Sequence, residues 1–200
     1  MVAIINNQMK ESREDMDVNQ ARQELAEHNR KGTPVLCSAT IYWSVMFGLS
    51  FFIESASLLA LIYLYGTGLL LPLGLLIAKV MKIEMYRKIN PLSGLSGLIA
   101  STPAFMAPLT AYIYLTDPAA MPFAMAIITG AHFFPFAWLY QSKSFVFSPL
   151  IMMAASLVSI FTFPDMQFLI IPILMIVSLV GMVVWALSEQ KERSELKRMA

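Results

Sequence analysis

The feature that most constrains this chain is a series of six apolar runs, separated by short connections, between residues 34 and 187. Each run has roughly 19–24 residues, and a helix of that length crosses a hydrocarbon core of about 30 Å. Backbone polar groups in lipid must be satisfied within helices or closed barrels, and the alternating strands of a barrel are not seen in the sequence. We therefore predict an all-α, polytopic membrane protein. Its six transmembrane helices are expected at residues 34–53, 57–78, 92–115, 119–140, 145–163 and 167–187.

The distribution of charge supports a membrane fold. Apolar residues make up 58% of the chain and charged residues only 14%, whereas a soluble domain carries about 25% charged residues. Most of the charges lie in a leader at residues 1–33 and a tail at 188–200, on either side of a membrane domain at 34–187. Because the net charge is only +1, nucleic acid is not expected as a partner, and the lipid bilayer is.

The basic residues predict the orientation of the chain. The first, third and fifth connections contain Glu54, Asp117 and Asp165 but no Lys or Arg, so all 14 basic residues lie on the other side. Lys and Arg resist translocation, and this side is therefore expected to be cytoplasmic. The prediction is a bundle with both termini in the cytoplasm.

The leader is predicted to contain one short helix. Residues 1–15 look irregular, and a helix is expected from about Val18 to Arg30. Asp17 is placed to cap this helix, with Gln20 three residues later as in a capping box. We expect the helix to lie on the membrane surface, and docking to a partner is the alternative.

Ionisable groups at depth and interrupted helices mark functional sites in membrane proteins. His132 lies well inside the fourth span, and helix-breaking Gly and Pro residues lie at similar depth in the second, third and fourth spans. Carbonyl groups freed at these breaks are expected to line a polar cavity that Trp43, in the first span, also faces. The candidate ligand-binding residues are His132, Thr67, Gly68, Thr102, Pro103, Thr129 and Trp43.

Structural roles compete with this site hypothesis. His132 can instead hydrogen-bond a neighbouring helix, Trp43 can simply pack, and Gly and Pro often only kink membrane helices. In the third span, Ser93, Gly97 and Ser101 stand four residues apart, a spacing that allows close approach of another helix. We interpret this stripe as a packing surface.

The sequence contains no catalytic or metal-binding motif that we consider significant. There are no paired carboxylates, no phosphate-binding glycine loop and no cofactor fingerprint. Cys37 is the single cysteine, which excludes an intrachain disulfide. No catalytic residue, metal or cofactor is therefore predicted.

Two short segments resemble motifs of the rhomboid intramembrane proteases. These are Gly94-Leu95-Ser96-Gly97 and Gly130-Ala131-His132, and a Ser–His dyad can activate a hydroxyl as a nucleophile. In rhomboids both motifs lie on helices that run inward from the outer face, with another helix between them. Here Ser96 begins an outward-running helix on the span directly before that of His132. We therefore consider a serine protease the less favoured function.

A second resemblance covers more of the chain. It rests on the segments 21–26, 29–34, 65–68, 72–74 and 132–136 (ARQELA, NRKGTP, YGTG, PLG and HFFPF). These segments are similar to those of a family of small multi-pass proteins of bacterial inner membranes whose function is unknown. The resemblance implies location in the inner membrane and a six-helix topology, but no activity.

Two functions of different classes remain. In the first, the protein binds or transports a small solute at a mid-membrane site between the second, third and fourth helices. In the second, it is a non-transporting regulatory, immunity or assembly component that contacts a membrane protein partner. A hydrated cavity at His132 would favour the first, and a dry bundle with an exposed apolar groove would favour the second.

The orientation is testable with reporter fusions. Because Lys and Arg resist translocation, fusions after Glu54, Asp117 and Asp165 should report an extracytoplasmic location. Fusions after Lys88 and Lys143 should report a cytoplasmic one. A single reporter on the wrong side would overturn the predicted topology.

Overall fold

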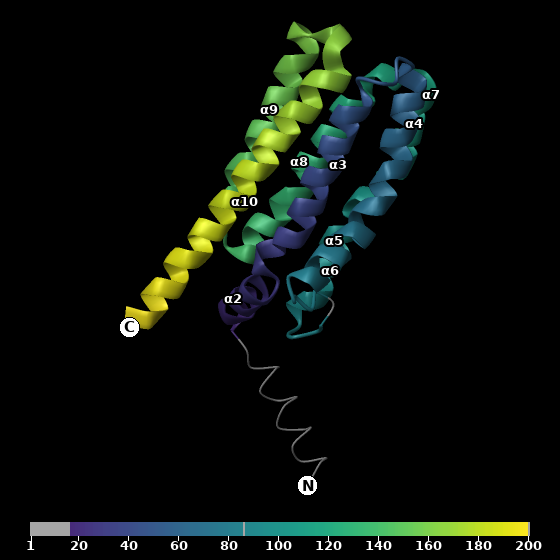
Figure 1. Ribbon diagram of the computed structural model, residues 1–200. Coiled ribbons are helices and arrows are strands. Elements are labelled where there is room, and N and C mark those ends of the chain that lie inside the picture. The colour runs from purple at the N-terminus through teal and green to yellow at the C-terminus, as the bar shows by residue number, and fades with distance from the viewer. Residues whose placement is uncertain (1–16, 86, 200) are drawn as a thin grey trace.

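The computed structural model describes residues 17–85 and 87–199, and these are almost entirely helical (Figure 1). Six helical segments are long and apolar enough to cross a membrane, which confirms the predicted number of candidate spans. They are Arg30–Leu49, Ala56–Val80, Leu92–Thr116, Pro118–Tyr140, Ser144–Thr162 and Pro164–Glu192. The segment 1–15, predicted to be irregular, lies outside the described residues.

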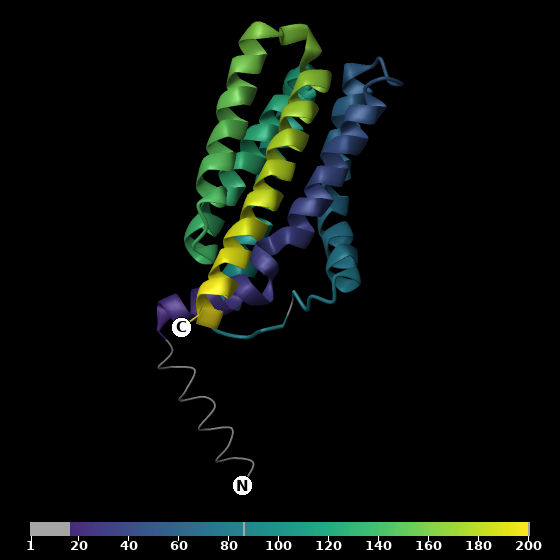
Figure 2. The ribbon, with the colours of Figure 1, turned by 60° about the vertical axis from the view of Figure 1, so that its left-hand side comes forward.

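The helices lie side by side and form an elongated bundle (Figures 1 and 2). We call the end that holds α2, the connection 81–91 and the turn 141–143 the terminal end, and the opposite end the far end. In chain order the elements are α2 (Val18–His28), η1 (Arg30–Gly32), α3 (Thr33–Leu49), α4 (Ala56–Gly66), η2 (Thr67–Leu69), α5 (Leu70–Val80), α6 (Leu92–Phe105), α7 (Ala107–Thr116), η3 (Pro118–Ala120), α8 (Met121–Tyr140), α9 (Ser144–Thr162), η4 (Pro164–Met166) and α10 (Gln167–Met199).

The core lies among α3, α8, α9 and α10. α3 packs against α5 and α10, and α9 packs against α8 and α10. The side chains of Trp43, Met121, Met152 and Met175, one from each of the four core helices, are at most 1% exposed. Flexible methionines fill the irregular spaces between helices. The second and third spans, α4–α7, therefore form an outer layer on this core.

Two of the three expected helix interruptions are present. The 3-10 helix η2 separates α4 from α5, and Met106 separates α6 from α7. The fourth span differs, because α8 continues through Gly130 and Pro135 without a break, so the expected interruption there is wrong. A Cβ atom on Gly130 would lie 2.6 Å from Cγ of Met153. Gly130 thus lets α9 approach α8 closely instead of opening the helix.

The leader helix α2 packs into the bundle, which differs from the expected surface location. Ala21, Leu25 and Ala26 are between 1% and 4% exposed, and α2 contacts α6 and α8. Asp17 stands at the N-cap as expected, but its side chain makes no capping hydrogen bond. Burial of a narrow apolar stripe, and not a cap, holds this helix in place.

Polar contacts also fasten α2 to the terminal end. Nε and Nη2 of Arg22 both donate to the carbonyl oxygen of Trp138, and the guanidinium carbon lies 4.4 Å from the centre of that indole ring. Nδ2 of Asn90 donates to the carbonyl oxygen of Ala21 at 2.7 Å. The leader therefore joins the end of α8 to the start of α6.

Removing the buried side chain of Leu25 should destabilise the whole bundle. Leu25→Ala leaves a cavity between α2 and the spans, and such core truncations cost about 2–5 kcal/mol of unfolding free energy. Val18→Ala is the control, because Val18 lies on the same helix and is 52% exposed. Unfolding of both variants can be followed in detergent by circular dichroism. Equal stability of the two variants would show that α2 does not pack on the bundle.

Candidate functional site

Of the candidate ligand-binding residues, His132 and Thr102 are joined by a hydrogen bond. Nδ1 of His132, on α8, lies 2.9 Å from Oγ1 of Thr102, on α6. The Thr102 hydroxyl also donates to the carbonyl oxygen of Ile99 at 2.8 Å. A hydroxyl has one proton, so with that donation in place Nδ1 of His132 donates to Thr102.

This bond compensates for a break in α6. Pro103 has no N–H, so the carbonyl group of Ile99, four residues earlier, loses its helical donor. The Thr102 hydroxyl replaces that donor, and His132 in turn bonds the hydroxyl. The contact therefore links α6 to α8, and it also supports the hydrogen bond that replaces the one lost at Pro103.

Two carbonyl groups beside the break in the second span accept hydrogen bonds from side chains of α3. The Tyr42 hydroxyl donates to the carbonyl oxygen of Tyr63 at 2.9 Å. Oγ of Ser38 lies 2.9 Å from the carbonyl oxygen of Leu70. Both carbonyl groups flank η2, and both contacts point into the α3 interface. They hold helices together where a polar cavity was expected.

Glycine makes this close contact with α3 possible. A Cβ atom on Gly66 would lie 3.1 Å from the ring of Tyr42, and one on Gly74 would lie 3.4 Å from Oγ of Ser38. Both distances are tight for a side chain in a packed interior. The glycines of the second span thus bring α4 and α5 against the hydroxyl donors of α3.

The other candidate residues lie in different surroundings. Trp43 is 1% exposed and packs edge-on against the rings of Tyr42 and Tyr63. The hydroxyl groups of Thr67 and Thr129 donate to carbonyl groups of their own helices. Gly68 is exposed, with no neighbouring atom near the position of a Cβ. In the described part of the chain no hydrogen bond joins these residues to His132, so their shared ligand role stays a prediction.

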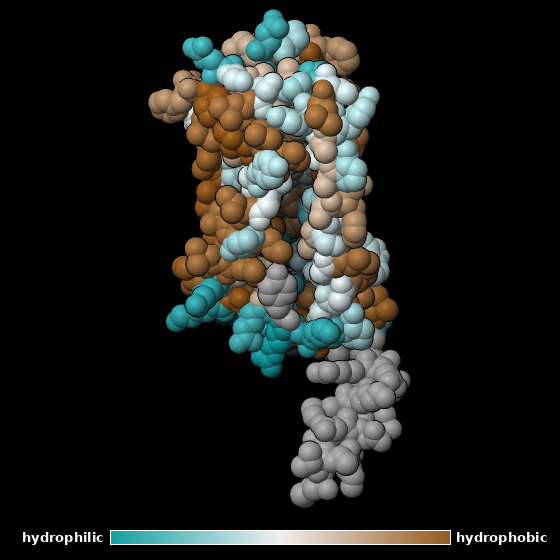
Figure 3. Space-filling view, turned by 90° about the vertical axis from the view of Figure 1, so that its right-hand side faces the viewer, coloured by the Kyte–Doolittle hydropathy of each residue, from teal (hydrophilic) through white to brown (hydrophobic). Residues whose placement is uncertain are grey.

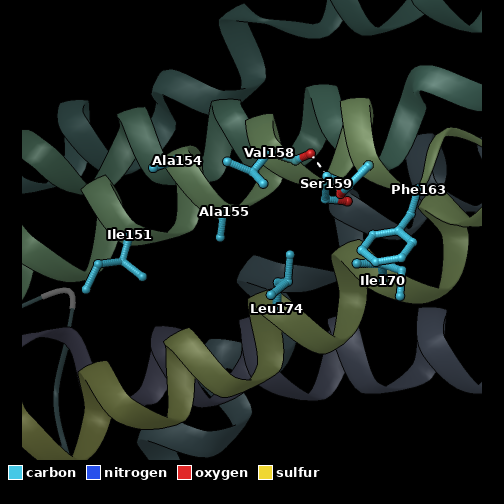
Figure 4. A pocket seen from close by; sticks show the side chains of 9 residues that line it. Ile151, Ala154, Ala155, Val158, Ser159, Phe163, Ile170 and Leu174 are labelled. Carbon is cyan, nitrogen blue, oxygen red and sulfur yellow. Dashed lines mark hydrogen bonds between the residues drawn. The ribbon is translucent and has the colours of Figure 1, made fainter.

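Two surface grooves lie elsewhere. One, of about 470 Å³, runs between α9 and α10 near the far end and is lined by apolar side chains such as Ile151, Ala155 and Leu174 (Figure 4). The second, of about 510 Å³, lies at the end of α5 among Lys79, Lys82 and Arg87. Neither groove is lined by any of the candidate ligand-binding residues.

The rhomboid-like serine and histidine have separate partners. His132 bonds Thr102, whereas Ser96 lies beside the hydroxyl group of Tyr140, one to two turns nearer the terminal end of the same helix pair. α6 and α8 run in opposite directions, which places Ser96 opposite Tyr140. The structure thus gives no contact between Ser96 and His132.

The sequence interpretation missed a polar cluster at the terminal end. Nζ of Lys31 lies 2.5 Å from Oε2 of Glu189, and these side chains are 2% and 17% exposed. Ser142 donates its hydroxyl proton to Oε2 at 2.5 Å, and the backbone N–H of Lys143 donates to Oε1 at 3.0 Å. Two features of the sequence pointed to this cluster. Glu189 follows the last apolar run, and Ser142, Lys143 and Ser144 form the polar connection between the fourth and fifth runs.

Comparison with known proteins identifies one match. A family model described as a family of unknown function (DUF7010) matches residues 18–189. No curated protein and no solved structure matches the chain. The matched range includes α2 and extends to Glu189, so it covers both partners of the Lys31–Glu189 contact.

A double-mutant cycle tests the contact between His132 and Thr102. His132→Ala and Thr102→Val should each destabilise the protein, and their effects should be non-additive by about 0.6–2 kcal/mol, the range for hydrogen bonds between membrane helices. Unfolding in mixed micelles measures the coupling. The control cycle pairs His132→Ala with Ser101→Ala. Its effects should be additive, because Ser101 donates to the carbonyl oxygen of Leu98 on its own helix. Additive effects for the Thr102 cycle would contradict the contact.

Proposed function

Since this chain belongs to DUF7010, a family of unknown function, we propose a role from its own geometry. The protein is a non-transporting component of the bacterial inner membrane, with both termini in the cytoplasm. It binds a transmembrane helix of another protein through the outer face of α6. The observation that carries this proposal is an exposed face of small residues on α6 that no helix among the described residues covers.

The unequal burial of the six spans supports an external partner. In the first and fourth spans 44% of the most apolar window is buried inside the protein, against 17% in the second span and 11% in the third. Among the described residues of α6, none is buried. The third span therefore contributes least to the fold of its own chain.

The exposed face of α6 is suited to close helix packing. Gly94, Gly97 and Ser101 are exposed, and no atom lies within 4 Å of a Cβ position on either glycine. Helices associate in lipid mainly through van der Waals contact, which small residues improve by letting backbones approach. Among the described residues no helix packs on these two glycines, whereas Gly66, Gly74 and Gly130 each have a neighbouring helix against them. A second transmembrane helix fits the open stripe.

The bonding of backbone groups at the helix breaks favours this role over solute transport. The carbonyl groups that lose their helical donors at the breaks in the second and third spans accept hydrogen bonds from Tyr42 and Thr102. Groups already bonded to protein are not available to replace the hydration shell of a solute. The breaks are accounted for by helix packing.

Solute binding at His132 remains the second candidate function. Its support is that His132 is only partly buried and lies beside the interruption between α6 and α7. A ligand there would compete with Thr102 for Nδ1 of the ring. Entry of a water-soluble thiol reagent to a cysteine at Thr102 would favour this function over partner binding.

A photo-crosslinking residue at Leu98 should capture the partner helix in native membranes. Leu98 lies on α6 and is 60% exposed, and Val177 on α10, which is 66% exposed, gives the matched control position. We expect one discrete adduct at Leu98 that Gly97→Leu reduces at least tenfold, because a bulky side chain prevents close approach.

Gly181→Leu controls for any general effect of placing a large side chain on an exposed helix surface. Gly181 is also an exposed helical glycine with open space at its Cβ position, but it lies on α10. This variant should leave the Leu98 adduct unchanged. An equal adduct at Val177 would overturn the proposal. An adduct of twice the mass of the chain would assign the face to self-association instead.

A further inference from the structure

The groove at the terminal end of α5 combines an apolar wall with a basic rim. Leu75, Ala78 and Ile83 line its wall, and Lys79, Lys82 and Arg87 stand around it. Its volume is about 510 Å³. Hydrophilic residues gather at this end of the bundle, below a largely apolar surface (Figure 3).

The backbone at the end of α5 builds this groove. The N–H of Ile83 donates to the carbonyl oxygen of Ala78 at 2.8 Å, which closes the helix with a Schellman-type turn. Lys82 adopts the left-handed conformation in this turn, with φ of 57°, a position where glycine is usual. The turn reverses the chain, buries Ile83 to 8% exposure and leaves Lys79 and Lys82 exposed on the rim.

The rim carries positive charge that the protein does not neutralise. Among the described residues, no ion pair or hydrogen bond is made by the ammonium group of Lys79 or of Lys82. Glu84 pairs only with Arg87, at 3.4 Å and with both side chains about 70% exposed. Elsewhere at this end, Lys31 is bonded to Glu189 and Arg22 to Trp138. The groove therefore has a net attraction for an anion.

The position of the groove identifies the class of anion. Lys79 lies in the last turn of an apolar helix long enough to cross a membrane, which is the level of lipid phosphate groups. The wall formed by Leu75 and Ala78 continues up that helix into the apolar region. A ligand that fits both features has an anionic head and an apolar chain.

We propose that this groove binds an anionic phospholipid. The phosphate group lies between Lys79 and Lys82, with Arg87 at the edge, and one acyl chain lies along Leu75 and Ala78. This assignment is independent of the partner site on α6, because it rests on charge and on the turn after α5.

Native mass spectrometry of the full-length protein in detergent tests the lipid site. The probes are dioleoyl phosphatidylglycerol and dioleoyl phosphatidylcholine, which share their acyl chains and differ in net charge. The wild-type protein should bind the anionic lipid at least tenfold more tightly. A juxtamembrane Lys contributes about fivefold to affinity for anionic lipid, so Lys79→Gln combined with Lys82→Gln should reduce binding of phosphatidylglycerol about thirtyfold.

Two controls separate this site from general attraction to basic residues. Lys143→Gln removes an exposed lysine at the same end but outside the groove, and it should leave binding unchanged. An equal loss in Lys143→Gln, or equal wild-type affinity for the two lipids, would overturn the proposal. Full displacement of the lipid by millimolar inorganic phosphate would also overturn it, because the site would then recognise a free anion and not a lipid.

Discussion

The ion pair between Lys31 and Glu189 fixes the terminal end of the bundle. Two charges withdrawn from water must be paired and hydrogen-bonded, and breaking such a pair costs about 3–5 kcal/mol. Here Glu189 also accepts hydrogen bonds from Ser142 and Lys143, so η1, the turn after α8 and α10 meet at one carboxylate. Arg30, Lys31 and Gly32 all have positive φ. That strained turn brings Lys31 to Glu189 and at the same time redirects the chain from α2 into α3.

A second constraint, the need to satisfy backbone groups in lipid, explains the interior. The second and third spans lose helical hydrogen bonds at η2 and at Pro103, and hydroxyl groups of Tyr42 and Thr102 replace the missing donors. The Tyr42 bond crosses from α3 and needs the close contact that Gly66 allows, whereas the Thr102 bond lies within α6. Interrupted helices in this protein thus specify which helices pack, and they do not by themselves indicate a transport path.

The sequence predicted those features of the fold that depend on residues close together in the chain. The number of spans follows from apolar length, and the breaks near Gly68 and Pro103 follow from the residues themselves. The continuity of α8 through Pro135 could not be predicted in this way, because tertiary contacts decide whether a proline opens a helix. The Lys31–Glu189 pair joins residues 158 positions apart, a separation at which no periodicity carries information. The hydrogen bond of His132 was foreseen as an alternative, but its partner depended on the register of α6 against α8.

The bundle consists of a packed core, α3 with α8, α9 and α10, and an outer hairpin of the second and third spans. The way the hairpin is attached affects the orientation of α6. The hairpin of the second and third spans joins the core mainly through α3 against α5 and α8 against α6. The connection 81–91 between them carries Lys82 and Arg87 of the basic rim, and it contacts α2 through the bond of His28 to the carbonyl oxygen of Glu84, at 3.0 Å. A lipid bound at Lys79 and Lys82 would therefore hold the terminal end of the second and third spans in place against α2. The open face of α6 would be held at a fixed angle to the core, which is the condition for a rigid helix-binding surface.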